Sequence, residues 1–107
     1  MSNSGNRIKD EAIREIAAGS ITTSYQVLGG VFLRDAFRLW MTNATNGDVY
    51  LSTDGVTDMK KFPASSGRAN DDKTNDMYRG EGTQWYIRYD TLPGAATGWF
   101  GLEVEYV

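Results

Sequence analysis

Apolar and polar residues alternate along most of the chain after residue 20. Four segments have apolar side chains at every second position, namely residues 36–42, 49–53, 84–89 and 99–107. A period of two is that of a β-strand with one buried face. Shorter segments of the same kind cover residues 21–27 and 59–62. About seven short strands, with turns about every 8 to 12 residues, predict an all-β fold, an antiparallel β-sandwich or barrel.

The N-terminal residues follow a different pattern. Four aliphatic positions lie on or beside one stripe of a helix, namely Ile8, Ala12, Ile13 and Ile16. Gly19 stands where a helix C-cap would fall. The spacing predicts a short amphipathic helix that needs a surface to lie on, because about 11 residues form a marginal helix alone. The predicted organisation is an N-terminal arm of residues 1–19 and a β-sandwich domain of residues 20–107.

The longest stretch without an apolar pattern covers residues 64–76, which are polar almost throughout. Clusters of small and polar residues between patterned segments are typical of exposed connections. We therefore expect a loop here.

Composition narrows the chemistry that is open to the chain. Its 107 residues include no cysteine and no histidine. This excludes thiol nucleophiles, thiolate zinc sites and Ser-His-Asp catalysis. A pair of carboxylates for glycoside hydrolysis is formally available, but nothing in the sequence selects one. We therefore expect no enzymatic activity and no cofactor.

Charge and hydropathy also limit the partners. The net charge is −3 at pH 7, whereas affinity for nucleic acid needs clustered Lys and Arg. No apolar run approaches the ~20 residues of a membrane span, and no secretory signal is visible at the N-terminus. We expect neither a nucleic acid nor a membrane as partner.

Acidic residues gather near the predicted turns, at Asp48, Asp54, Asp58, Asp71, Asp72 and Asp76. Carboxylates on neighbouring loops can hold Ca²⁺. Asp and Asn are also favoured in turns for their own backbone hydrogen bonds. Residues 54–58 lack the second and third ligand positions of a calcium-binding loop. We favour turn formation over a metal site.

Aromatic residues occupy more strand faces than one small core needs. Arg38 and Trp40 lie opposite Leu39 and Met41, and Tyr86 lies opposite the apolar residues of its strand. Trp, Tyr and Arg are enriched where proteins meet. The pattern predicts a protein–protein surface, and core variation or a carbohydrate platform of Trp40, Trp85 or Trp99 are the alternatives. The interface candidates are Ile8, Ile13, Ile16, Arg38, Trp40, Tyr86 and Trp99.

Residues 18–29 and 46–55 resemble small virion structural proteins of tailed bacteriophages, and residues 82–87 are similar to a later strand of the same type. The resemblance covers residues 18–107. It implies a compact β-sandwich with an N-terminal arm in the head shell, the neck or the tail. The predicted helix departs from the short extended arms of such proteins. No functional position is carried over.

The resemblance and the residue patterns together imply a non-enzymatic virion protein, assembled in the bacterial host cytoplasm. We expect it to form a homo-oligomer and to bind capsid, connector or tail subunits as a ring component of the head–tail junction or tail. Its arm would become ordered on assembly. The alternatives are a capsid decoration (cement) protein and a carbohydrate-binding module.

Overall fold

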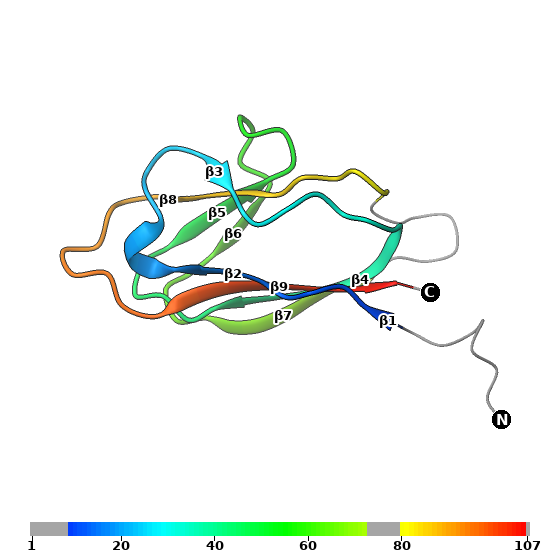
Figure 1. Cartoon of the computed structure of the whole chain (residues 1–107). Coiled ribbons are helices and arrows are strands. Elements are labelled where there is room, and N and C mark those ends of the chain that lie inside the picture. The colour runs from blue at the N-terminus through cyan, green and yellow to red at the C-terminus, as the bar shows by residue number, and fades with distance from the viewer. Residues whose placement is uncertain (1–8, 73–79, 107) are drawn as a thin grey trace, which may run out of the picture.

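The computed structural model describes residues 9–72 and 80–106. Nine strands in these residues form two antiparallel sheets that pack as a β-sandwich, so the predicted fold class is confirmed (Figure 1). The larger sheet contains β1 (Lys9–Asp10), β2 (Arg14–Ala17), β9 (Trp99–Tyr106), β4 (Ala36–Asn43) and β7 (Gly67–Asp72). The smaller sheet contains β3 (Gln26–Val27), β8 (Tyr86–Tyr89), β5 (Val49–Ser52) and β6 (Lys60–Phe62).

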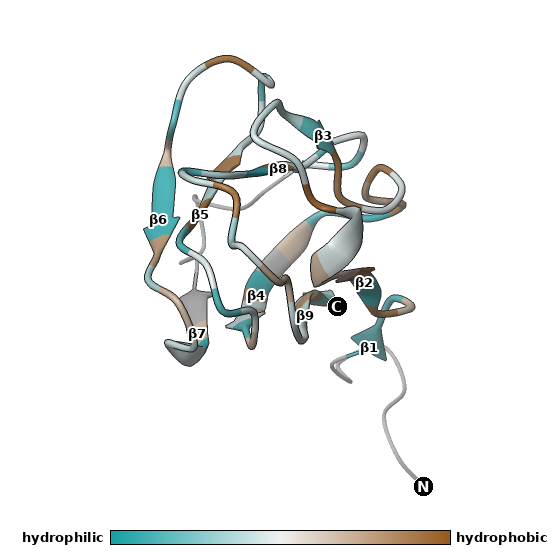
Figure 2. Ribbon diagram, turned by 90° about the vertical axis from the view of Figure 1, so that its left-hand side faces the viewer, coloured by the Kyte–Doolittle hydropathy of each residue, from teal (hydrophilic) through white to brown (hydrophobic). Residues whose placement is uncertain are grey.

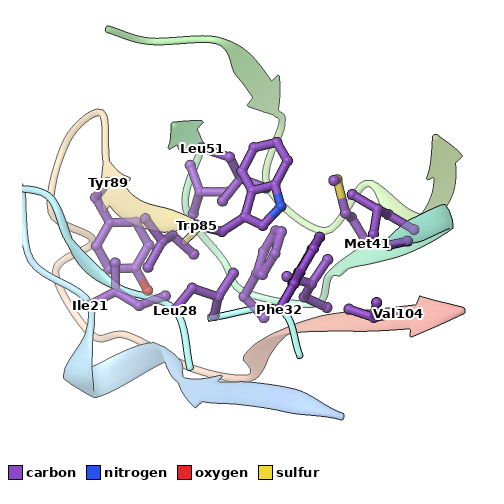
Figure 3. Close-up of a cluster of buried hydrophobic side chains, with 14 residues drawn as sticks. Ile21, Leu28, Phe32, Met41, Leu51, Trp85, Tyr89 and Val104 are labelled. Carbon is purple, nitrogen blue, oxygen red and sulfur yellow. The ribbon is translucent and has the colours of Figure 1, made fainter. Parts of the chain in front are cut away.

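The core forms between the two sheets from the alternating apolar positions. In β9, Phe100, Leu102 and Val104 are fully buried, whereas Glu103 is only half-buried on the opposite face. One face of each sheet therefore serves the core, as is usual for antiparallel sheets. The largest buried side chains include Trp85, which lies within the core cluster (Figure 3).

The helix predicted over residues 8–19 is wrong for the residues that can be compared. Lys9–Asp10 and Arg14–Ala17 form β1 and β2, which both pair with β9, and a 3₁₀ turn follows at Ala18–Ser20. The buried side chain is Arg14, while Ala12 and Ile13 from the supposed apolar stripe are exposed. Pairing with β9 gives the backbone N–H and C=O groups of this segment hydrogen-bond partners. A short isolated helix would be only marginally stable in water. This segment is thus part of the sheet rather than an arm that orders only on assembly.

A β-bulge separates β1 from β2. Asp10 pairs with Glu105 and Arg14 pairs with Leu102. Three residues therefore lie between the two paired positions on the N-terminal segment, whereas only two lie between them on β9. The extra residue bends the strand, as bulges do at sheet edges. This bend turns the side chain of Arg14 inward and lets Ile13 point to solvent.

The loop predicted over residues 64–76 is also wrong in part. Gly67–Asp72 form β7, which pairs with β4, and residues 73–76 lie outside the described ranges. The chain enters this strand through positive φ angles at Ser65 (53°) and Gly67 (83°). β7 is an edge strand. Its sequence is polar, so it shows no alternation of apolar residues by which a strand could be predicted.

Candidate functional site

The predicted interface residues lie on separate surfaces. Ile13 borders a groove beside β2, and Ile16 packs against the core. Arg38, Trp40 and Trp99 belong to the outer face of the larger sheet, whereas Tyr86 belongs to the outer face of the smaller one. Ile8 lies outside the described residues. The structure thus brings three of the seven candidates together on one face.

The groove lies between residues 11–15, around the bulge, and the loop that leads from β3 to β4. Its volume is about 500 Å³. Three aliphatic side chains in its wall are largely exposed: Ile13 (52%), Val31 (44%) and Leu33 (61%). Figure 2 shows hydrophobic positions in β2 next to the hydrophilic β1. The groove is therefore an apolar surface at an edge of the larger sheet.

An ion pair forms the floor of the groove. The Arg14 guanidinium donates to a carboxylate oxygen of Glu11 at 2.7 Å, and the side chains are only 9% and 4% exposed. Arg14 also donates to the carbonyl oxygens of Gly30 (2.9 Å) and Val31 (3.0 Å). The second Glu11 oxygen accepts the backbone N–H groups of Leu33 and Arg34, at 3.1 and 3.0 Å. The pair therefore ties the loop to the bulge.

Glycine lets the loop approach this ion pair. Gly29 has a φ of +70°, and a Cβ atom there would lie 2.5 Å from Cγ of Arg14. Only glycine fits a position with both a positive φ and so close a neighbour. The Gly29-Gly30 pair is the one signal of this contact in the sequence, and a glycine pair alone does not indicate which side chain it faces.

Trp40 sits in a network of charges on the outer face of the larger sheet. The guanidinium of Arg68 lies 3.9 Å from the centre of the Trp40 ring and donates to Glu103 at 3.0 Å. Glu105 accepts from the Trp40 indole N–H (3.3 Å) and from Arg38 (3.2 Å). These cation–π and ion-pair contacts cover much of the Trp40 ring. Trp40 is therefore less available to a ligand than an isolated surface tryptophan.

Of the three tryptophans considered for a carbohydrate platform, Trp85 is not accessible to a ligand. Trp85 is buried in the core among residues of both sheets (Figure 3). It shares its strand face with Ile87 and Tyr89, which are also buried. Trp99 keeps 38% of its surface exposed and is the candidate most open to a ligand.

A second cluster of aromatic and charged residues lies on the outer face of the smaller sheet. Arg88 donates to both carboxylate oxygens of Asp58, at 3.2 and 2.8 Å. Its guanidinium lies 5.4 Å from the Tyr25 ring centre and 4.7 Å from that of Tyr50. The Tyr25 hydroxyl donates to the same carboxylate. Tyr86 takes no part in these contacts and lies near Gly55, where an added Cβ atom would be 3.6 Å from its ring.

These contacts shift two pKa values in opposite directions. Burial, followed by the hydrogen bond to Asp58, raises the pKa of Tyr25 to about 12. Hydrogen bonds from Arg88 and Tyr25 lower the pKa of the Asp58 carboxyl. A carboxyl with a depressed pKa stabilises the fold at pH values above its unfolded pKa of about 3.9 and loses this effect as pH falls through its folded pKa.

The variant Asp58→Asn should therefore be less stable than the wild type at neutral pH, because it removes a charged partner of Arg88. The difference in melting temperature should shrink as pH falls from about 4 through the lowered pKa of the folded wild-type carboxyl, because protonation removes the same charge from the wild type. In the same variant the pKa of Tyr25 should fall from about 12 toward its ordinary value. Thermal melts across pH and titration of tyrosinate absorbance measure both effects. A pH-independent difference would contradict this account of Asp58.

Two acidic residues of the turns, Asp54 and Asp48, accept hydrogen bonds from backbone N–H groups. Asp54 accepts hydrogen bonds from the Ser52 hydroxyl and from the N–H groups of Val56 and Thr57, which lower its pKa. Asp48 accepts the N–H of Ala64 at 2.8 Å. No group of three acidic side chains converges within residues 9–72 and 80–106 as a metal site would need. The local hydrogen bonds of Asp54 are those of a turn former, whereas Asp71 and Asp72 belong to β7 and Asp76 lies outside the described residues.

Comparison with protein-family models, curated proteins and solved structures adds no identification. The chain matches none of them. In the ranges that the structure describes, no helix is long and apolar enough to cross a membrane. What the protein does must therefore be inferred from its own surfaces.

Proposed function

We propose that the protein is a non-enzymatic structural subunit that associates with further copies of itself through the groove. The observation that carries this proposal is the exposure of Ile13, Val31 and Leu33 around a groove of about 500 Å³. Removing such half-exposed aliphatic side chains from water contributes on the order of 1 kcal/mol each. An interface between copies supplies that burial, whereas the single domain does not.

The floor and the edge of the groove both favour an extended segment as its occupant. The Glu11–Arg14 pair is neutral as a whole and already hydrogen-bonded within the domain, so it presents no net charge to a partner. β2 pairs with β9 alone among the described strands. A strand with one free side can accept a further strand, with apolar pockets selecting its side chains. We infer that an extended segment of a second copy adds beside β2.

The setting we propose is the virion of a tailed bacteriophage, assembled in the host cytoplasm. The resemblance of residues 18–107 to small virion structural proteins supports this setting. When a patch on one copy contacts a different patch on the next, the copies form a closed ring if the rotation between neighbours is a simple fraction of a full turn. The binding free energies of several modest interfaces then combine to hold the ring together. We therefore propose a ring at the head–tail junction or in the tail that also binds capsid, connector or tail subunits.

Leu33→Lys should abolish or strongly weaken self-association, because it places a charge in the apolar wall of the groove. We expect the apparent dissociation constant to rise by about tenfold or more. Leu92→Lys is the matched control, because Leu92 is similarly exposed (58%) but lies in the turn between β8 and β9. Sedimentation velocity over a concentration series compares the variants. Equal association of Leu33→Lys and the wild type would exclude the groove.

A further inference from the structure

The indole of Trp99 lies across its own strand. A Cβ atom on Gly101 would lie 2.6 Å from Cζ3 of Trp99 and 3.3 Å from Cε3, so the six-membered ring occupies the space above this glycine. Gly101 is buried although it is on the outer face of the sheet, whereas 38% of the Trp99 side chain is exposed. One face of the ring is thus covered by the strand, and the other is turned toward solvent.

Small and polar residues border this ring. Ala17 pairs with Trp99 across β2, and Thr42 and Glu15 pair with Gly101 from the strands on either side. Opposed residues in a sheet lie about 5 Å apart, so hydroxyl and carboxylate oxygens flank the indole. Next along the sheet is the ion pair of Arg68 and Glu103, with an N–O distance of 3.0 Å. The site is a flat aromatic surface framed by hydrogen-bonding groups.

We propose that Trp99 is the stacking platform of a saccharide-binding site that takes β-1,4-linked pyranose chains with equatorial substituents. Such sugars present axial C–H groups on their ring faces, and the negative face of an indole attracts these weakly positive hydrogens. Their hydroxyl groups point outward in the plane of the ring, where Thr42, Glu15 and the Arg68–Glu103 pair can exchange hydrogen bonds with them. Trp99 itself does not line the groove, and Glu15 borders both the groove and this site.

The charges around Trp99 favour a sugar over an apolar protein surface. The ion pair Arg68–Glu103 lies next to the covered glycine on the outer face, and Arg38–Glu105 lies further along the same strand. Covering these pairs with an apolar surface would remove their water without replacing its hydrogen bonds, which is costly. Sugar hydroxyls replace that water while the pyranose ring covers the indole.

The test is a titration of the full chain with chitohexaose and cellohexaose, followed by tryptophan fluorescence and isothermal calorimetry. The wild type should show saturable binding of at least one of them. Trp99→Ala should weaken it by about tenfold or more. Gly101→Val should do the same while keeping Trp99, because the new side chain occupies the space of the indole ring. The nearest atoms to a Cβ at Gly101 all belong to Trp99, so we expect this variant to fold.

Tyr86→Ala is the matched control, because it removes an aromatic side chain from the outer face of the other sheet; it should bind as the wild type does. Thermal melts confirm that each variant is folded. The proposal is overturned if neither oligosaccharide binds saturably at millimolar concentration, or if folded Trp99→Ala binds as tightly as the wild type. It is also overturned if Trp99→Ala loses self-association instead of sugar binding, which would make this face a protein interface.

Discussion

Replacing Arg14 by methionine is expected to lower the free energy of unfolding by about 3–5 kcal/mol, as removal of one partner from a buried ion pair does. The variant leaves the Glu11 carboxylate, whose side chain is 4% exposed, without its cation. It also leaves the carbonyl groups of Gly30 and Val31 without the donor that now lies at 2.9 and 3.0 Å. The loop over the groove should loosen together with the loss of stability.

Urea unfolding of the wild type and of three variants measures this effect. The double variant Glu11→Gln/Arg14→Met should recover part of the stability, because it no longer buries an unpaired charge. Arg34→Met is the control, since Arg34 is exposed and should change stability by less than about 0.5 kcal/mol. A loss below about 1 kcal/mol in Arg14→Met would show that the ion pair does not hold the loop.

Asn43→Asp is expected to destabilise the fold by about 3 kcal/mol or more at neutral pH. Asn43 is fully buried at the end of β4. Its amide nitrogen donates to the carbonyl oxygens of Gly47 (3.2 Å), Phe62 (3.1 Å) and Pro63 (2.8 Å). A carboxylate cannot donate, so the variant places a buried negative charge against three carbonyl oxygens.

The effect of Asn43→Asp should depend on pH. Burial beside carbonyl oxygens raises the pKa of the new carboxyl in the folded state above its unfolded value of about 3.9. Stability then falls as pH rises between these two pKa values, so acidification toward pH ~4 should restore part of it. Asn46→Asp is the control, because Asn46 is exposed and should lose about 1 kcal/mol. Equal losses in the two variants would contradict the role given to Asn43.

The strands with clean alternation could be predicted from the sequence. The segments at residues 36–42, 49–53 and 99–107 correspond to β4, β5 and β9 within about two residues, because each has one face on the core. β2 and β7 could not be predicted in this way. Their stability comes from pairing with β9 and β4, and an edge strand needs no apolar alternation to pair.

The groove was only partly predictable. Ile13 was an interface candidate as an apolar residue on the flank of the predicted helix, whereas Val31 and Leu33 gave no signal, because they lie in a loop without a periodic pattern. Strand alternation does place Trp85 on the face of Ile87 and Tyr89, and burial confirms it. The position of the Trp99 ring above Gly101 depends on side-chain packing, which the sequence does not reveal.

Covering of the groove by a second copy is the central claim, and thiol labelling tests it most directly. The chain has no cysteine, so the variants Leu33→Cys and Leu92→Cys each carry a single thiol. The rate of reaction with a maleimide is measured in folded protein over a series of protein concentrations. We predict that the Leu33→Cys thiol becomes progressively protected as the concentration rises, while the Leu92→Cys thiol reacts at a constant rate. Reaction of both thiols at rates that do not change with protein concentration would contradict the account.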